Sequence, residues 1–298
     1  MPRVIEIDEF ASCEPEECAD AIAETGFDPA CEESLATCAK WLRRLGNNRS
    51  FLGDMLIEQL KDSGGGVDSG YGPQAIVLSP LRGDMFLRAN IWPSERDQCF
   101  HASGARSFVY GVPHDHNFSF LTCGYLGPGY RSDYFEYDYA TVAGYPGEPA
   151  GLRFVERSAL HEGKLLLYRA HLDVHSQLPP EALSVSLNAK HVDPAQHWFD
   201  QYGFDLHEDT VTGALSPNST EVFLRVAVAT GIEAAQDLAE QFGRCHPSDR
   251  LRLASFEARE LLVADLAARD ALWREAELAG SRLLAEAAAM KRRALTGA

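Results

Sequence analysis

The sequence predicts a mainly β core that is preceded by N-terminal helices and followed by a C-terminal α-helical region. Three observations lead to this fold class. Apolar residues recur at helical spacing before residue 62, short strand-like segments follow from residue 75, and Ala, Leu, Glu and Arg dominate after about residue 219. We therefore expect a helical cap at 1–66, a β-barrel domain at 67–215 and a helical region at 216–298.

The composition favours a globular protein and argues against some partners. Hydrophobic residues make up 45% and charged residues 24% of the 298 residues, as is ordinary for folded domains. The formal net charge of -17 disfavours nucleic acid and membrane surfaces as partners, because both attract clustered Lys and Arg. The N-terminus lacks the features of a secretory signal, and no apolar stretch is long enough to cross a membrane. We expect a cytoplasmic protein.

The N-terminal helices are predicted from apolar stripes between residues 14 and 62. One stripe follows the i, i+3, i+4, i+7 spacing of a helix face and consists of Leu35, Cys38, Ala39, Leu42 and Leu45. Gly46-Asn47-Asn48 interrupts the pattern, which resumes at Phe51. The run Ser63-Gly64-Gly65-Gly66 has the composition of a linker. These helices are expected to pack as a cap on the later sheet.

Short β-branched or aromatic segments follow the linker and alternate with Gly, Pro and Asp turns. The expected strands lie at 75–80, 85–93, 106–109, 118–125, 134–139, 151–155, 164–168 and 183–187. Such a density of short strands is typical of a double-sheet barrel or sandwich rather than of βαβ units.

The C-terminal region begins its long helical run after Pro247-Ser248-Asp249, which is a helix-start signal. The segment 246–256 resembles the second-helix start of a HEAT-type repeat, but no clear second copy is present. We expect a lid or a dimerisation element, which would allow a homodimer through these helices. A true repeat array is the alternative.

Histidines between residues 110 and 188 carry the clearest chemical signal. His114 and His116 are two residues apart on an extended segment, so their side chains point the same way. A third histidine on a returning strand would complete a metal site, because neutral imidazole is the commonest nitrogen ligand of transition metals. His175 is favoured by its position before the strand at 183–187, and His171 remains the alternative. By the same alternation Cys123 is expected on the opposite face, packed between layers.

The pair His114-x-His116 after a long β prelude, with a later His175, resembles the cupin superfamily, whose jelly-roll barrels hold a metal ion inside. Many cupins place a glutamate four or five residues after the second histidine, where this chain has Phe120 and Leu121. The pattern therefore resembles the three-histidine cupins, and among them the thiol dioxygenases (cysteine dioxygenase and its relatives).

The flanking segments 83–92 and 184–188 extend this resemblance, which covers roughly residues 70 to 195. One departure concerns the substrate. Thiol dioxygenases carry a Ser-x-His-x-Tyr arrangement on the last strand, whereas the equivalent positions here are Ser186, Asn188 and Lys190. We therefore expect a relative that acts on a different, larger substrate than cysteine.

The resemblance implies a non-haem iron oxygenase that uses Fe(II) and dioxygen; zinc, nickel or manganese are the alternative metals. Its substrate would be a small amino-acid-like, thiol or amine molecule that chelates the metal. Expected catalytic residues are Ser186, Arg88, whose guanidinium fork suits a carboxylate, and Tyr125, one of a tyrosine-rich group. The other members of that group are Tyr130, Tyr134, Tyr137 and Tyr139.

Two other classes of function stay open. A cupin with a non-redox metal could act as an isomerase or hydrolase. A non-catalytic cupin could bind a small molecule and signal through its helical tail. A 2-oxoglutarate oxygenase would need one carboxylate ligand in an H-x-D/E pair, for which only His171-Leu172-Asp173 qualifies.

Overall fold

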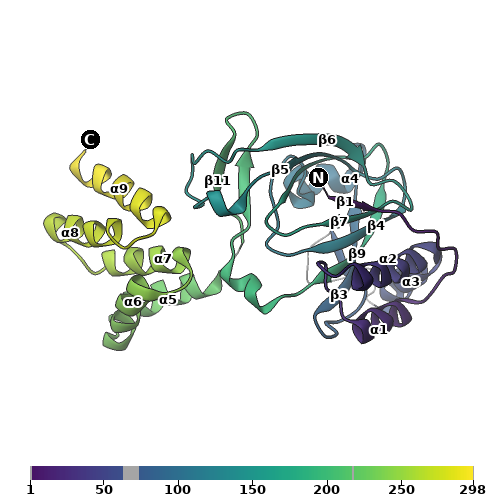
Figure 1. Ribbon diagram of the computed structural model, residues 1–298, viewed down its shortest axis with the longest axis horizontal. Coiled ribbons are helices and arrows are strands. Elements are labelled where there is room, and N and C mark those ends of the chain that lie inside the picture. Colours follow the sequence, from purple (N-terminus) through teal and green to yellow (C-terminus); the bar gives the residue numbers. More distant parts are fainter. Residues whose placement is uncertain (1, 63–73, 217, 298) are drawn as a thin grey trace. The chain divides into compact units, whose positions relative to one another are not determined.

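The computed structural model describes residues 2–62, 74–216 and 218–297 (Figure 1). The expected linker at 63–66 lies outside these residues. The chain divides into two compact units, one made of Met1–Tyr139 and Gly151–Gln196, the other of Ala140–Ala150 and His197–Ala298. The expected boundaries at 66 and 215 stay predictions.

Among its described residues, the first unit contains two antiparallel sheets. The six-stranded sheet has the order β1-β7-β4-β9-β3-β2. Its strands are β1 (Arg3–Ile5), β2 (Ala75–Val77), β3 (Met85–Trp92), β4 (Phe120–Leu126), β7 (Leu165–Tyr168) and β9 (Ser184–His191). The three-stranded sheet has the order β6-β5-β8 and consists of β5 (Arg131–Glu136), β6 (Arg153–Ala159) and β8 (Asp173–Leu178). The expected fold class, a β core with helices before and after it, is confirmed.

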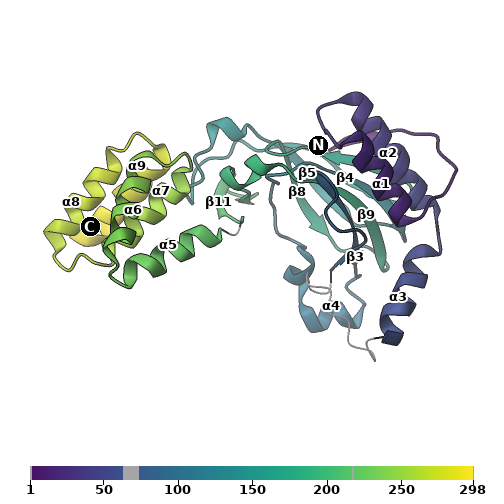
Figure 2. The same cartoon turned by 90° about the horizontal axis from the view of Figure 1, so that it is seen from below.

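Helices cover one face of the six-stranded sheet (Figures 1 and 2). They are α1 (Pro15–Thr25), α2 (Glu32–Asn47) and α3 (Phe51–Asp62), as the apolar stripes predict. Alternate residues of β3, β4 and β9 pack against them, among them Leu87, Leu121 and Leu187. The intervening residues point to the other face, so the period of two along each strand separates a helix-facing core from an inner face of the β core.

Some expected elements differ in the structure. Residues 106–109, expected as a strand, form a 3-10 helix at Ala105–Phe108, preceded by helix α4 (Gln98–Ser103). Val109 ends that turn with a φ of 61°, in the left-handed region that a strand cannot adopt. Strand β1 was not expected from the sequence, because it is only three residues long and is held by its pairing with β7.

The second unit combines a hairpin with a helical bundle. The hairpin is β10 (Tyr202–Asp205) with β11 (Thr210–Ala214), which the sequence pattern did not reveal. The helices are α5 (Ser219–Ala229), α6 (Glu233–Cys245), α7 (Asp249–Glu260), α8 (Leu266–Glu277) and α9 (Arg282–Thr296). Phe256, Trp273 and Leu284 form part of the bundle core. Within the described residues, no helix combines the length and apolar character needed to cross a membrane.

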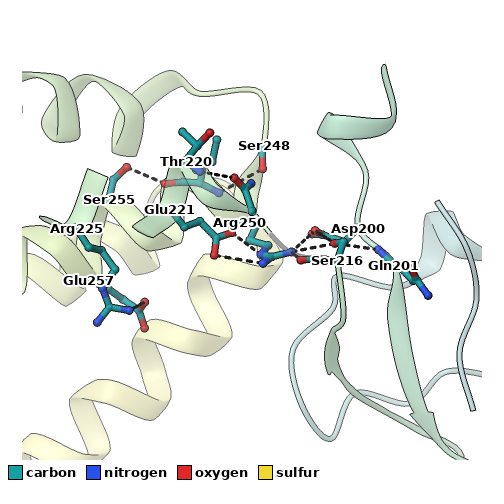
Figure 3. Close-up of polar contacts among 12 residues, drawn as sticks. Asp200, Gln201, Ser216, Thr220, Glu221, Arg225, Ser248, Arg250, Ser255 and Glu257 are labelled. Carbon is teal, nitrogen blue, oxygen red and sulfur yellow. Dashed lines mark hydrogen bonds and ion pairs between the residues drawn. The ribbon is translucent and has the colours of Figure 1, made fainter. Parts of the chain in front are cut away.

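Arg250 joins the hairpin to the helices of this unit (Figure 3). From α7, its Nη1 donates to the Asp200 carboxylate at 2.8 Å and to the Ser216 carbonyl at 2.8 Å, on either side of the hairpin. It also forms an ion pair with Glu221 on α5. A single guanidinium therefore fixes both ends of the hairpin against α5 and α7.

Candidate metal centre

Three histidines meet inside the first unit. The ligand nitrogens of His114, His116 and His175 all lie within 4.8 Å of one another, and all three residues are buried. The Nε2 atoms of His114 and His175 are 3.2 Å apart. The ring centroids are separated by 4.9 Å for His114 and His116, and by 5.0 Å for His116 and His175. This is a compact group of nitrogen donors on the interior of the β core.

Backbone pairing brings these rings together. His114 and His175 form an antiparallel bridge in which each backbone N–H donates to the other's carbonyl, at 3.1 and 3.0 Å. His175 lies on β8, whereas His114 and His116 lie in the segment before β4. Residues directly opposite in such a pair present their side chains on the same face. His116, two residues further on, lies on that face too and packs edge-on against Phe120.

Burial keeps these imidazoles neutral. It lowers the pKa of His114, and it lowers the pKa of His116 and His175 well below the ordinary histidine value of 6.5. The Nδ1 of His114 lies 2.7 Å from the Val112 carbonyl, so Nδ1 carries the proton and Nε2 keeps its lone pair. Neutral imidazoles of this kind are the form that binds a metal ion.

The surroundings of the rings fit a divalent cation. The Nδ1 atoms of His116 and His175 are buried and have no hydrogen-bond partner among the described residues. The Nε2 atoms of His114 and His175 are 3.2 Å apart, so a single cation beside them can be reached by both. Such a cation would bind the Nε2 lone pairs of these two neutral rings.

His171, the alternative third ligand, lies outside the group. Its ring packs against Tyr139 at a centroid distance of 4.3 Å, and its φ of 61° marks a turn before β8. Asp173, the carboxylate that a 2-oxoglutarate oxygenase would require, instead accepts a hydrogen bond from the Arg169 backbone at 2.7 Å and forms an ion pair with its guanidinium. Among the described residues, the donor group therefore consists of histidines without a carboxylate.

The three histidines line a cavity of about 190 Å³ in the first unit. Most of the other lining residues come from β3, β4, β8 and β9. They are Gln74, Ala75, Arg88, Asn90, Trp92, Val109, Phe120, Tyr130, Gln177 and Asn188. The cavity thus has an aromatic part, a polar part and the imidazole group, a combination typical of small-molecule sites.

The three expected catalytic residues have different positions. Arg88 lines the cavity. Ser186 is buried but does not line the cavity. Its hydroxyl accepts a 2.9 Å hydrogen bond from the indole of Trp92, which does. Tyr125 lies on the helix-covered face, where its hydroxyl donates to the Asn48 carbonyl at 3.0 Å. Its odd separation from His116 places it there, and the bulge between Gly124 and Leu126 does not turn it inward. The expectation that Tyr125 reaches the metal site does not match this position.

Tyr130 is the member of the tyrosine group that lines the cavity. Its hydroxyl lies 3.3 Å from that of Tyr168, which in turn lies 3.2 Å from the Tyr134 hydroxyl. Burial raises the pKa of Tyr168 well above its ordinary value and raises the pKa of Tyr134 to about 12. These phenols stay protonated, so a hydrogen-bond donor is held at the cavity beside the histidines.

Sequence reasoning missed several lining residues that a simple signal could have identified. Gln177 is two residues after His175 on β8, and Asn90 and Trp92 continue the alternation from Arg88 on β3. All of them share a strand face with a residue already assigned to the site. Val109 and Gln74 gave no such signal, because they lie outside the strands.

Comparisons with known proteins give only distant likenesses. No protein-family model and no curated protein matches the chain. Similar solved structures include salicylate 1,2-dioxygenase from Pseudaminobacter salicylatoxidans, at 11% identity and a TM-score of 0.27 over 48% of this chain and 33% of that chain. Hydroquinone 1,2-dioxygenase from Sphingomonas sp. TTNP3 matches at 7% identity and a TM-score of 0.26, over 44% of this chain and 70% of that chain. The DMSP lyase DddQ from Ruegeria pomeroyi matches at 10% identity and a TM-score of 0.27, over 64% of this chain and 79% of that chain.

This chain spans about a third of the salicylate dioxygenase that it resembles. At such low TM-scores these likenesses assign no activity. The β core with an internal group of three histidines is the coarse arrangement that the cupin resemblance implies.

Proposed function

We propose that this chain is a metal-dependent oxygenase that oxidises a small, metal-chelating molecule with dioxygen. The observation that carries the proposal is the buried group of three neutral histidines beside a cavity. His114, His116 and His175 would hold the ion, and iron(II) is proposed because of the cupin resemblance. A ferrous ion bound by three neutral ligands supplies open coordination positions for substrate and dioxygen.

The residues of the cavity prepare the site in defined ways. Burial keeps the three imidazoles neutral, so they can bind a cation without first losing protons. Trp92 and Phe120 provide an apolar surface that excludes water. Tyr130 holds a phenolic proton at the cavity, where it can donate to a bound substrate. Ser186 positions the Trp92 indole by accepting its N–H.

The size of the cavity limits the substrate. At about 190 Å³ it is smaller than the roughly 300–1,000 Å³ of pockets that take drug-sized ligands. An amino-acid-like, thiol or amine molecule is therefore of the right scale. Arg88 provides a cation that can bind an anionic part of such a substrate.

Oxygen uptake by the iron-loaded protein tests the proposal. The protein would be purified without oxygen, loaded with iron(II), and assayed with small amino acids, thiols and amines. We expect substrate-dependent uptake that is lost in His116→Ala and retained in His161→Ala, whose ring lies outside the histidine group. Turnover that proceeds equally well without oxygen would instead establish an isomerase or hydrolase. Ligand binding without turnover under any metal would identify a binding protein.

A further inference from the structure

A second cavity of the first unit is lined by the edge strand β1, by helix α2 and by the turn that leads into β7. Its volume is about 310 Å³, which exceeds the volume of the cavity beside the histidines. The two cavities share no lining residue. Part of the wall of the second cavity is apolar and consists of Val4, Ile5, Ile7 and Leu165.

Arg43 of α2 brings a guanidinium without an acidic partner to this cavity. Its Nε is buried and has no hydrogen-bond partner, and within residues 2–62, 74–216 and 218–297 the side chain forms no ion pair. A Cβ at Gly163 would collide with Arg43 Nη1, so the guanidinium lies directly on the backbone of the turn before β7. Burial raises the pKa of the neighbouring Cys123 thiol to about 11, so this thiol stays neutral and does not balance the charge of Arg43.

Lys164 adds a second cationic donor to the lining. Its Nζ donates to Ser158 Oγ at 3.2 Å and to the Ala159 carbonyl at 3.1 Å. An ammonium group has three N–H donors, so one remains for a ligand. Burial lowers the pKa of Lys164, and the charges of Glu156 and Glu6 oppose this shift. An anion bound in the cavity would favour the charged form of this lysine in the same way.

The charges around the cavity leave one cation without a counter-charge. Glu162, one of the two acidic lining residues, forms an ion pair with Arg49 at 3.0 Å. Glu6, the other, interacts electrostatically with Lys164. Arg43 is therefore the cation that a ligand can neutralise. A singly charged anion suffices for this, whereas the two glutamates would repel the second charge of a dianion such as phosphate.

We propose that this cavity is a second ligand site, which binds a small monocarboxylate with a short apolar chain. Arg43 binds the carboxylate, because its planar fork can donate two parallel N–H bonds to the two oxygens, and Lys164 donates its remaining N–H. The hydrocarbon part of the ligand packs against Ile5 and Leu165. This site is independent of the proposed oxidation, since none of these residues lines the cavity beside the histidines.

NMR of the arginine side chains in the full chain tests this assignment at Arg43 itself. Buried N–H groups exchange slowly with water, so the Arg43 Nε–H signal can be observed, and its loss in Arg43→Lys identifies it. We expect this signal to shift saturably with butanoate and to stay in place with butanamide and butylammonium. Inorganic phosphate should bind more weakly than butanoate. An unmoved signal with butanoate would overturn the site, and tighter binding of phosphate would overturn the monocarboxylate.

Two variants measured through the same signal control the result. Lys164→Gln should weaken butanoate binding by at least about tenfold, because a charge-assisted hydrogen bond is lost. Arg44→Gln removes the neighbouring arginine of α2, which pairs with Glu9 at 2.9 Å and does not line the cavity, and should leave the affinity unchanged. Equal affinity in Lys164→Gln and the wild type would exclude Lys164 from the site. Equal weakening in both variants would show a general effect of charge and overturn the proposal.

His116→Ala separates this site from the metal centre. The variant should lose metal and oxygen uptake, but the Arg43 signal should still respond to butanoate, because His116 lies in the other cavity. Loss of the response in this variant would assign the butanoate effect to the cavity beside the histidines and overturn the second site. A response that persists in a wild-type protein without oxygen uptake would leave the second site standing while the oxygenase proposal fails.

Discussion

Tyr137 donates a 2.5 Å hydrogen bond to Asp115, the residue that separates His114 from His116. Asp115 is fully buried and points away from the two histidines, as the alternation of side chains predicts. Its carboxylate therefore lies behind the histidine pair. The hydrogen bond connects the segment before β4 to the end of β5. It therefore holds in place the backbone that carries His114 and His116.

Tyr137→Phe should destabilise the protein by about 1.5–3 kcal/mol, since it removes a buried hydrogen bond to a charged group. Because the histidine backbone loses this support, the variant should also bind metal more weakly. Urea unfolding and a metal competition titration measure the two effects. Wild-type values for both would show that the hydrogen bond does not hold the segment in place.

Metal content should depend on three particular histidines. We expect His114→Ala, His116→Ala and His175→Ala each to lose most of the bound metal, because each removes one nitrogen from the group. His171→Ala and His161→Ala should retain it. Elemental analysis of the purified variants provides the measurement. Retention of metal by His175→Ala together with loss in His171→Ala would reverse the assignment of the third ligand.

The stability of the metal-free protein should fall in acid. The pKa of each of the three histidines is lower in the folded protein than the ordinary value of 6.5, because burial disfavours the charged form. Above about pH 6.5 the three histidines are neutral in both the folded and the unfolded states, so they add no pH dependence to the free energy of unfolding. Below it the unfolded chain binds protons that the folded chain does not, and stability decreases by up to about 1.4 kcal/mol per pH unit for each histidine.

Urea unfolding between pH 5 and 7 tests this dependence. His175→Ala removes one of the titrating groups. It should therefore reduce the slope of the unfolding free energy against pH by up to about 1.4 kcal/mol per pH unit, which corresponds to one proton. An unchanged slope would mean that His175 is not buried as a neutral ring in the metal-free protein.

Arg250→Ala should destabilise the second unit by roughly 1.5–3 kcal/mol, because Asp200, Ser216 and Glu221 all lose a charged donor. Arg225→Ala is the matched control (Figure 3). Its guanidinium is half-exposed and lies 3.5 Å from Glu257, so its loss should cost less than about 1 kcal/mol. Thermal unfolding monitored by circular dichroism compares them. Equal losses in the two variants would contradict the role given to Arg250.

The alternation of side chains along strands made much of the site predictable. It predicts that His114 and His116 share one face of the chain and that Cys123 lies on the opposite face. The structure buries Cys123 against the N-terminal helices, as predicted. By the same alternation Tyr125, which is nine positions after His116, belongs on the face opposite to the histidines. Only a bulge that turns the strand could bring Tyr125 to the inner face. The bulge is present, but the helix-facing packing and the hydrogen bond to Asn48 hold the ring on the outer face.

The amino-acid sequence alone determined the helical stretches, most of the strands and the pair His114 and His116, because these depend on spacing along a short segment. Only the tertiary structure decided that His175 and not His171 joins the histidine group, that Tyr130 lines the cavity, and that Lys190 lies diagonal to Arg88. Each of these depends on which strands pair and in what register. The register depends on how segments far apart in the chain pack together, so it cannot be predicted from a local sequence pattern.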